Sequence, residues 1–228
     1  STLEKNADEI KILSGKVNEC LKHKEVNDNK WNDLKKAEDG RLTKLSKAIE
    51  SILTEYKDPA PDRVKEFTDL HKGLSTEYTD VCSAIEASYK AETLIENWED
   101  KTVEEKEIKG FNSKISDLEK SVLDAVTSAK ASADNRQAYD DTKKHNNDKD
   151  IAGKITEARK NLNGKWAENV EKDAKNHYLS VLAECEAINS KIIGDIEQAY
   201  EDGQSATEQA NLIKRIDDLL NKVDAVGP

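Results

Sequence analysis

The fold is decided by the stretch from Tyr178 to Val223, which reads YLSVLAECEAINSKIIGDIEQAYEDGQSATEQANLIKRIDDLLNKV. Apolar and small residues recur in it at alternating spacings of four and three, the heptad pattern of a helix that lies along partner helices. The positions of this seam are Tyr178, Leu182, Cys185, Asn189, Ile192, Ile196, Ala199, Gly203, Ala206, Ala210 and Ile213. The pattern predicts one uninterrupted helix, whose small positions leave room for a close neighbour.

The composition favours narrow apolar stripes on long helices. Of the 228 residues, 36% are apolar, 5% aromatic and 36% charged, a smaller apolar share than a compact globule usually carries. Three prolines and nine glycines leave few places for turns. The formal charge is −11 and the basic residues are dispersed among acidic ones, which argues against a nucleic-acid partner.

Four helices are predicted, near residues 3–57, 62–109, 112–142 and 151–224. Pro59 and Pro61 end the first helix, and so short a linker requires an antiparallel return. Gly110 stops the second helix, although a second helix unbroken through Gly110 is the alternative. The predicted fold is all-α: an elongated three-helix bundle over residues 1–228, in which the first, second and last helices pack together, with a small helical head insertion at about 110–162.

The predicted helices give each cysteine a height, which is its position along the axis of the bundle. On this arrangement Cys20 of the first helix and Cys185 of the last lie at similar heights, whereas Cys82 on the antiparallel second helix lies away from both. We therefore expect a disulfide between Cys20 and Cys185 in an oxidising compartment, with Cys82 as a lone buried thiol. Three free core cysteines are the alternative.

Two partial metal motifs are present, and neither is complete. Residues 146–157 match several liganding positions of a calcium loop, but Ile151 stands where a glycine is needed and Lys154 occupies another ligand position. Cys20 and His23 share a helical face as half of a metal site. We expect an acidic turn followed by a helix, and, because no nucleophile motif or phosphate loop occurs, neither an enzyme nor a bound cofactor.

A protein-binding face is predicted from the apolar side chains that the seams leave outside. With the hairpin closed at 57–62, residue 30 of the first helix lies at about the level of residue 89 of the second. An exposed tyrosine beside an aliphatic group and cations is suited to anchoring a protein partner. The predicted ligand-binding residues are Val26, Asn29, Lys30, Tyr89 and Lys90, and the alternative location is the head between residues 112 and 163.

The layout resembles the surface proteins of African trypanosomes. The shared features are a long first helix that contains Cys20, a proline-marked hairpin, a smaller inserted region and a long last helix, together with the residues Val17-Asn18-Glu19-Cys20-Leu21. Within that superfamily the resemblance is closest to the haptoglobin-haemoglobin receptors, and next to the glutamate/alanine-rich coat proteins and invariant surface glycoproteins.

The resemblance implies a receptor on the extracellular face of the plasma membrane that binds haemoglobin or haptoglobin-haemoglobin for haem uptake, without catalysis. No apolar run approaches the roughly 20 residues needed to cross a bilayer, so we expect an excised ectodomain whose membrane attachment has been removed. The resemblance implies that this attachment is a C-terminal glycosylphosphatidylinositol anchor. One departure from the resemblance is that no Asn-x-Ser/Thr sequon occurs, whereas bloodstream-stage members of the superfamily are often glycosylated; this suits an insect-stage protein. Two other classes stay open: a coat protein that acts as a spacer without a ligand, and an intracellular helical adaptor.

Overall fold

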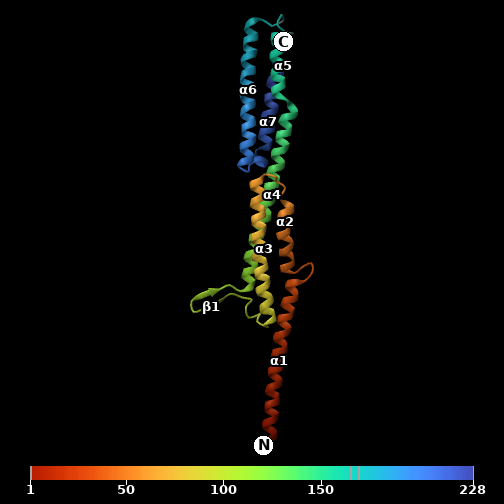
Figure 1. Cartoon of the computed structure of the whole chain (residues 1–228), viewed down its shortest axis with the longest axis vertical. Coiled ribbons are helices and arrows are strands. Elements are labelled where there is room, and N and C mark those ends of the chain that lie inside the picture. Colours follow the sequence, from red (N-terminus) through yellow and green to blue (C-terminus); the bar gives the residue numbers. More distant parts are fainter. Residues whose placement is uncertain (1, 165, 169, 228) are drawn as a thin grey trace. The chain divides into compact units, whose positions relative to one another are not determined.

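The computed structural model describes residues 2–164, 166–168 and 170–227, and it confirms an all-α fold built from helical bundles (Figure 1). The chain divides into two compact units, Ser1–Lys130 and Ala131–Pro228. We call them the first and the second unit. Each unit has its own hydrophobic core, so the two are described separately.

The first unit contains α1 (Thr2–Lys35), α2 (Arg41–Glu55), α3 (Pro61–Lys90) and the beginning of α4 (Phe111–Lys149). The predicted first helix is therefore interrupted, and the interruption ends at Gly40. A Cβ atom added to Gly40 would lie 2.5 Å from the carbonyl oxygen of Leu34, so only glycine allows the backbone to turn so tightly there. The predicted hairpin between the first and second helices is confirmed, since α2 ends at Glu55 and α3 begins at Pro61.

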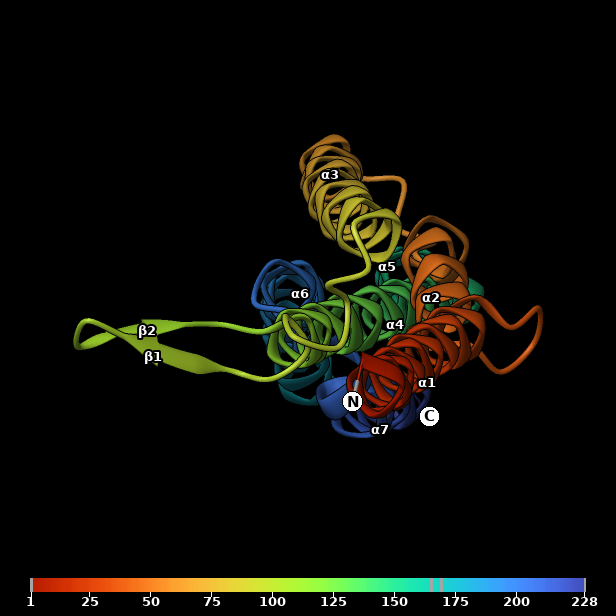
Figure 2. The same cartoon turned by 90° about the horizontal axis from the view of Figure 1, so that it is seen from below.

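The predicted second helix is too long, because α3 ends at Lys90 instead of continuing to residue 109. The strands β1 (Lys101–Val103) and β2 (Lys106–Ile108) form an antiparallel hairpin beyond it, which projects from the helices of the first unit (Figure 2). Glu104 and Glu105 at its tip both have positive φ angles, the backbone of a tight two-residue hairpin turn. The next helix begins at Phe111. Gly110 therefore precedes a helix start, as expected, but it follows the β hairpin and does not stop the second helix.

The core of the first unit consists of two clusters. The larger one joins α2, α3 and α4 through Leu45, Ile49, Ile52, Phe67, Leu74, Leu118, Val122, Ala125 and Ala129. The other joins the C-terminal end of α1 to the start of α2, to α3, the following loop and the start of α4 through Leu34, Leu42, Ile85, Leu94, Trp98, Phe111 and Ile115. Arg41 at the start of α2 adds a two-pronged ion pair with Glu119 of α4, in which its Nε and Nη2 donate at 2.9 and 2.7 Å.

The second unit contains the end of α4, α5 (Ile151–Asn163), α6 (Lys172–Glu201) and α7 (Ser205–Asp224). The prediction of one uninterrupted last helix is wrong, because the chain turns at Gly203, whose φ is +71°. Asn135 of α4 holds this turn, since its side chain donates to the carbonyl of Tyr200 at 3.1 Å and accepts from the amide of Ser205 at 2.7 Å.

The seam predicted for the last helix is confirmed only as far as the turn. Its α6 positions Leu182, Cys185, Asn189, Ile192, Ile196 and Ala199 are buried. Beyond Gly203, Ala206 and Ala210 are exposed, and α7 instead buries Ser205, Leu212, Ile216, Leu219 and Val223. The heptad spacing continued across the turn by coincidence, because small residues satisfy it without indicating which side of a helix is buried.

The partners of α6 and α7 also differ from the prediction. Their core is shared with α5 and with Tyr139 of α4, all within the second unit. The first, second and last predicted helices therefore do not form one common core, and the segment predicted as a head, about 110–162, supplies α4 and α5 to these bundles.

The predicted disulfide is wrong for the same reason. The three cysteines, all within the described residues, are free thiols: Cys20 is exposed on α1, Cys82 is half-buried on α3, and Cys185 lies in the core of the second unit. Burial raises the pKa of both the Cys82 and the Cys185 thiol. The heights that paired Cys20 with Cys185 assumed a shared bundle that the two cores do not make.

Candidate protein-binding surface of the first unit

The predicted binding residues lie where the end of α3 meets α1. Tyr89 stacks on Trp31, with ring centroids 4.8 Å apart and planes 7° apart, and its hydroxyl donates to Asp28 Oδ1 at 3.0 Å. The expected level, residue 30 beside residue 89, is therefore confirmed. The short hairpin between the helices fixed this register even though α1 and α2 are separate helices.

Three aromatic side chains and two lysines gather at this level, and we call them the aromatic end: Trp31, Tyr89, Trp98, Lys30 and Lys35. Lys35 Nζ lies 4.5 Å from the centroid of the Trp31 ring, and Lys30 Nζ lies 4.2 Å from that of Trp98. Each ammonium group faces the electron-rich surface of a ring, an attractive arrangement that also holds the lysine stem along the ring.

The predicted residues divide between the two flanks of α1. Tyr89 contacts Trp31 and Asp28, whereas Lys30 contacts Trp98 of the loop after α3. Val26 and Asp28 point about 200° apart on a helix with 3.6 residues per turn, so Val26 faces away from the Tyr89 flank. Val26 and Tyr89 therefore share a level but do not form one continuous patch.

Tyr89 is less exposed than the sequence predicted. Its ring is half-buried and packs against the smaller core cluster of the first unit. The hydrogen bond to Asp28 raises the pKa of its hydroxyl, because ionisation would place two negative charges together. A Tyr89→Ala substitution is thus expected to disturb packing as well as binding, so the exposed cations beside it are cleaner probes.

The exposed cations of the Tyr89 flank are Lys35 and Lys90. Lys90 forms an ion pair with Glu86 one turn earlier on α3, with Nζ and Oε1 2.8 Å apart. The pair lowers the pKa of Glu86, chiefly through the hydrogen bond from Lys90. These two lysines border a rigid, half-exposed aromatic stack, and such a combination is frequent at the energetic centres of protein interfaces.

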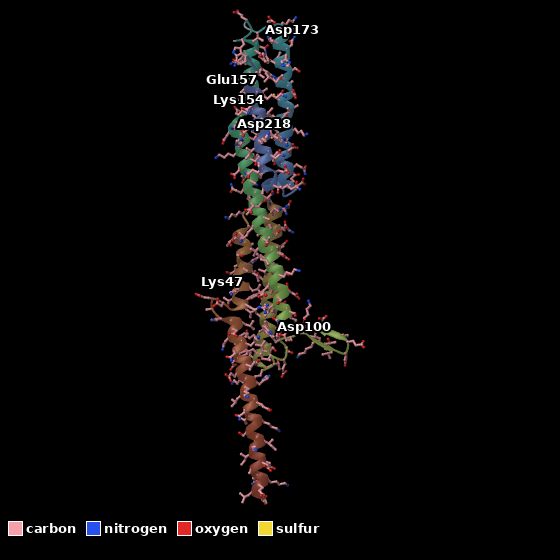
Figure 3. The ribbon with its side chains drawn as sticks, turned by 180° about the vertical axis from the view of Figure 1, so that it is seen from behind. Lys47, Asp100, Lys154, Glu157, Asp173 and Asp218 are labelled. Atoms are coloured by element: carbon pink, nitrogen blue, oxygen red, sulfur yellow. The ribbon has the colours of Figure 1, made fainter. Side chains whose placement is uncertain are left out.

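The opposite flank is organised by the loop that follows α3. Asn27 is buried, and its side-chain oxygen accepts from the amide of Ile95 at 3.2 Å. Asp100 fixes the base of the β hairpin, where Figure 3 labels it, by accepting from the amide of Gly110 at 2.7 Å and from Ser113 Oγ at 2.9 Å. These hydrogen bonds lower the pKa of its carboxyl group, the one from Gly110 most strongly.

Sequence reasoning missed the roles of Trp31 and Trp98, because both residues fall within ranges predicted as helix, 3–57 and 62–109. Only Trp31 is helical, whereas Trp98 belongs to the loop and contributes to the core. The hairpin had a readable signal: Thr102, Val103 and Ile108 are β-branched residues on either side of Glu104-Glu105, in a segment where the helical pattern had already thinned.

The residues of the two partial metal motifs have structural roles or simple pair contacts. Residues 146–149 end α4, and Asp150, in a left-handed conformation, caps α5 by accepting from the amide of Gly153. His23 lies 3.8 Å from Glu96. Within the part of the chain that the structure describes, no three or more His, Cys, Asp or Glu side chains are grouped to hold a metal ion.

Comparison with known proteins finds no family model, no curated protein and no solved structure that matches this chain. Among the described residues, no helix is both long and apolar enough to cross a bilayer.

Proposed function

We propose that this chain is a cell-surface receptor that binds a protein ligand, haemoglobin or haptoglobin-haemoglobin, on the Tyr89 flank of the first unit. The choice of ligand rests on the resemblance of the layout to trypanosome haptoglobin-haemoglobin receptors. The choice of surface rests on one observation, the half-exposed Trp31–Tyr89 stack held by Asp28.

This stack supports protein binding because it is already ordered in the free chain. Tyr89 is restrained on its face by Trp31 and at its hydroxyl by Asp28, so little rotamer entropy is lost when a partner covers the pair. Lys35 and Lys90 add positive charge beside it in a chain that is acidic overall. A partner with an apolar patch bordered by carboxylates would match this flank.

The test is a binding titration of haemoglobin and of haptoglobin-haemoglobin on the immobilised chain. Lys35→Glu and Lys90→Glu are each expected to weaken binding by ~1 kcal/mol, about fivefold, while the chain stays folded with only a small change in melting. Lys72→Glu is the matched control, because Lys72 is also an exposed lysine of α3 but lies away from the aromatic end.

Two results would count against the proposal. If the unaltered chain binds neither ligand at micromolar concentration, the result would favour the alternative that it is a coat protein, which acts as a spacer without a ligand. Loss of affinity in Val26→Asp, with Lys35→Glu and Lys90→Glu unaffected, would move the ligand to the opposite flank of α1.

A further inference from the structure

The N-terminal part of α1 carries an apolar seam that its own unit leaves uncovered. Every residue from 2 to 22 is exposed, and Figure 1 shows this part of α1 extending past the other helices of the first unit. The exposed fractions of Ile10, Leu13 and Val17 are 67%, 60% and 56%. These values are large for aliphatic side chains that share one helical face.

This uncovered seam continues a seam that is packed further along the same helix. Its heptad a positions are Leu3, Ile10, Val17, Lys24 and Trp31, and its d positions are Asn6, Leu13, Cys20, Asn27 and Leu34. The last three, Asn27, Trp31 and Leu34, are covered by the loop after α3 and by α3 itself. The same face therefore changes from packed to bare between Asn27 and Cys20.

A bare helix of this composition gains no stability from packing. Most of the stability of helices in proteins comes from packing of their apolar face, and Gly15 in the interior costs roughly 1 kcal/mol relative to alanine. Ile10 and Val17 at a positions and Leu13 at a d position form the apolar side along which a coiled coil packs. We propose that residues 3–20 of α1 pair antiparallel with the same segment of a second copy of this chain.

The antiparallel orientation follows from what covers the seam at Asn27. A parallel second copy would direct its own α1 into the space of the loop at Ile95, which hydrogen-bonds Asn27. In an antiparallel pair the first units of the two copies lie at opposite ends of the paired segment. The α1 helix of each copy therefore ends before it reaches the Ile95 loop of the other copy. Such a helix occupies the position that a longer α3 would have filled.

One antiparallel register satisfies both the seam and the charges. In it a positions face d positions of the second copy, which pairs Leu3 with Cys20, Asn6 with Val17 and Ile10 with Leu13, each twice by symmetry. The same register brings Glu9 of each copy beside Lys16 of the other, because both occupy g positions. Polar Asn6 adds a reason for this register to be preferred over shifted ones.

The net charge of the segment also favours self-association there. The whole chain carries −11, so two copies repel over most of their surface. Residues 2–22 are neutral, with acidic Glu4, Asp8, Glu9 and Glu19 balanced by basic Lys5, Lys11, Lys16 and Lys22. This surface is distinct from the proposed ligand flank, and either can exist without the other.

The test is sedimentation equilibrium of the full chain, with a reductant present, over a range of concentrations. The unaltered chain is expected to dimerise, and Ile10→Asp to weaken the dimer about 100-fold or more, because it places a charge in the seam. Ile12→Asp is the matched control, since Ile12 is 59% exposed but lies off the seam at a c position.

Charge reversal tests the orientation. Lys16→Glu is expected to weaken the dimer roughly threefold to tenfold, by placing like charges beside Glu9 of the second copy. Adding Glu9→Lys restores it. In a parallel pair these g positions would face Ser14 and Leu21 of the other copy, so neither change would have this reciprocal effect.

Cysteine trapping gives an independent reading of the register. After mild oxidation, Leu3→Cys is expected to yield covalent dimers linked to Cys20 of the second copy, whereas the unaltered chain is not. A monomer at every concentration would overturn the proposal, and so would a Cys20-to-Cys20 bond in the unaltered chain, because only a parallel pair brings those two thiols together.

Discussion

The exposed seam of α1 and the buried seam of α6 have the same spacing and opposite surroundings. In α6, the seam positions Leu182, Cys185 and Ile192 lie in the core of the second unit, while in α1 the seam positions Leu13, Val17 and Cys20 are exposed. A heptad repeat thus shows that a helix has an apolar side, but it does not show whether the partner belongs to the same chain.

The largest expected effect compares single truncations of the two seams. Ile192→Ala removes atoms from a fully buried site and is expected to lower the free energy of unfolding by ~2–5 kcal/mol. Ile10→Ala in α1 is expected to change it by less than ~0.5 kcal/mol. Urea denaturation of dilute protein, followed by circular dichroism, measures both.

The neighbouring residue provides the control for this pair. Ile193 has the same side chain and helix as Ile192 but is 43% exposed, so Ile193→Ala is expected to cost clearly less. Equal losses at Ile10 and Ile192 would show that α1 has a packed seam in the monomer and would break the comparison.

A smaller effect is expected at the turn that shapes the second unit. Asn135→Ala leaves the amide of Ser205 without its buried acceptor and removes one of the donors to the carbonyl of Tyr200, which is expected to cost ~1–3 kcal/mol. Its exposed neighbour Asp134 is the control, and Asp134→Ala should change the urea midpoint little. A neutral Asn135→Ala would mean that Gly203 alone makes the turn.

The corresponding contact of the first unit is more exposed and should be weaker. Tyr89→Phe keeps the stack on Trp31 but removes the hydrogen bond to Asp28, and we expect a loss of ~0.5–1.5 kcal/mol. Asp28→Asn, which retains an acceptor, should cost less than Tyr89→Phe. The reverse order would indicate that charge, not hydroxyl donation, stabilises this contact.

The smallest effect is a pH dependence located at the hairpin base. The pKa of Asp100 is lowered in the folded chain, mainly by the amide of Gly110, so the unfolded chain binds this proton more readily. Its stabilising contribution is present above the pKa of the unfolded state and is lost as pH falls through the folded value. Asp100→Asn should therefore make the decline in stability below ~pH 5 shallower.

Carboxyl chemical shifts report this titration directly. A carbon-detected NMR titration is expected to give Asp100 a midpoint below that of an ordinary aspartate. Ser113→Ala removes one of the two groups that donate hydrogen bonds to the Asp100 carboxylate. It should therefore raise the midpoint part of the way toward that of an ordinary aspartate. An ordinary midpoint in the unaltered chain would show that the hairpin base is open in solution.

Much of the local structure could be predicted from the sequence. Pro59 and Pro61 fixed the α2–α3 hairpin, Gly110 marked the start of α4, and the register of Tyr89 against α1 followed from the length of that hairpin. The candidate surface was located at the correct level but was assigned to one face. Which flank a residue occupies depends on where the loop after α3 packs, and no periodicity encodes that position.

The sequence by itself determined that this chain is helical, because apolar residues at spacings of three and four bury a stripe only on helices. Only the tertiary structure decided which stripes meet. Gly203 permits either a continued helix or a reversal, and Asn135, distant in sequence, selects the reversal by satisfying the backbone groups of the turn. That choice directs α7 back against α6, gives the second unit its own core, and leaves Cys185 within it as a free thiol.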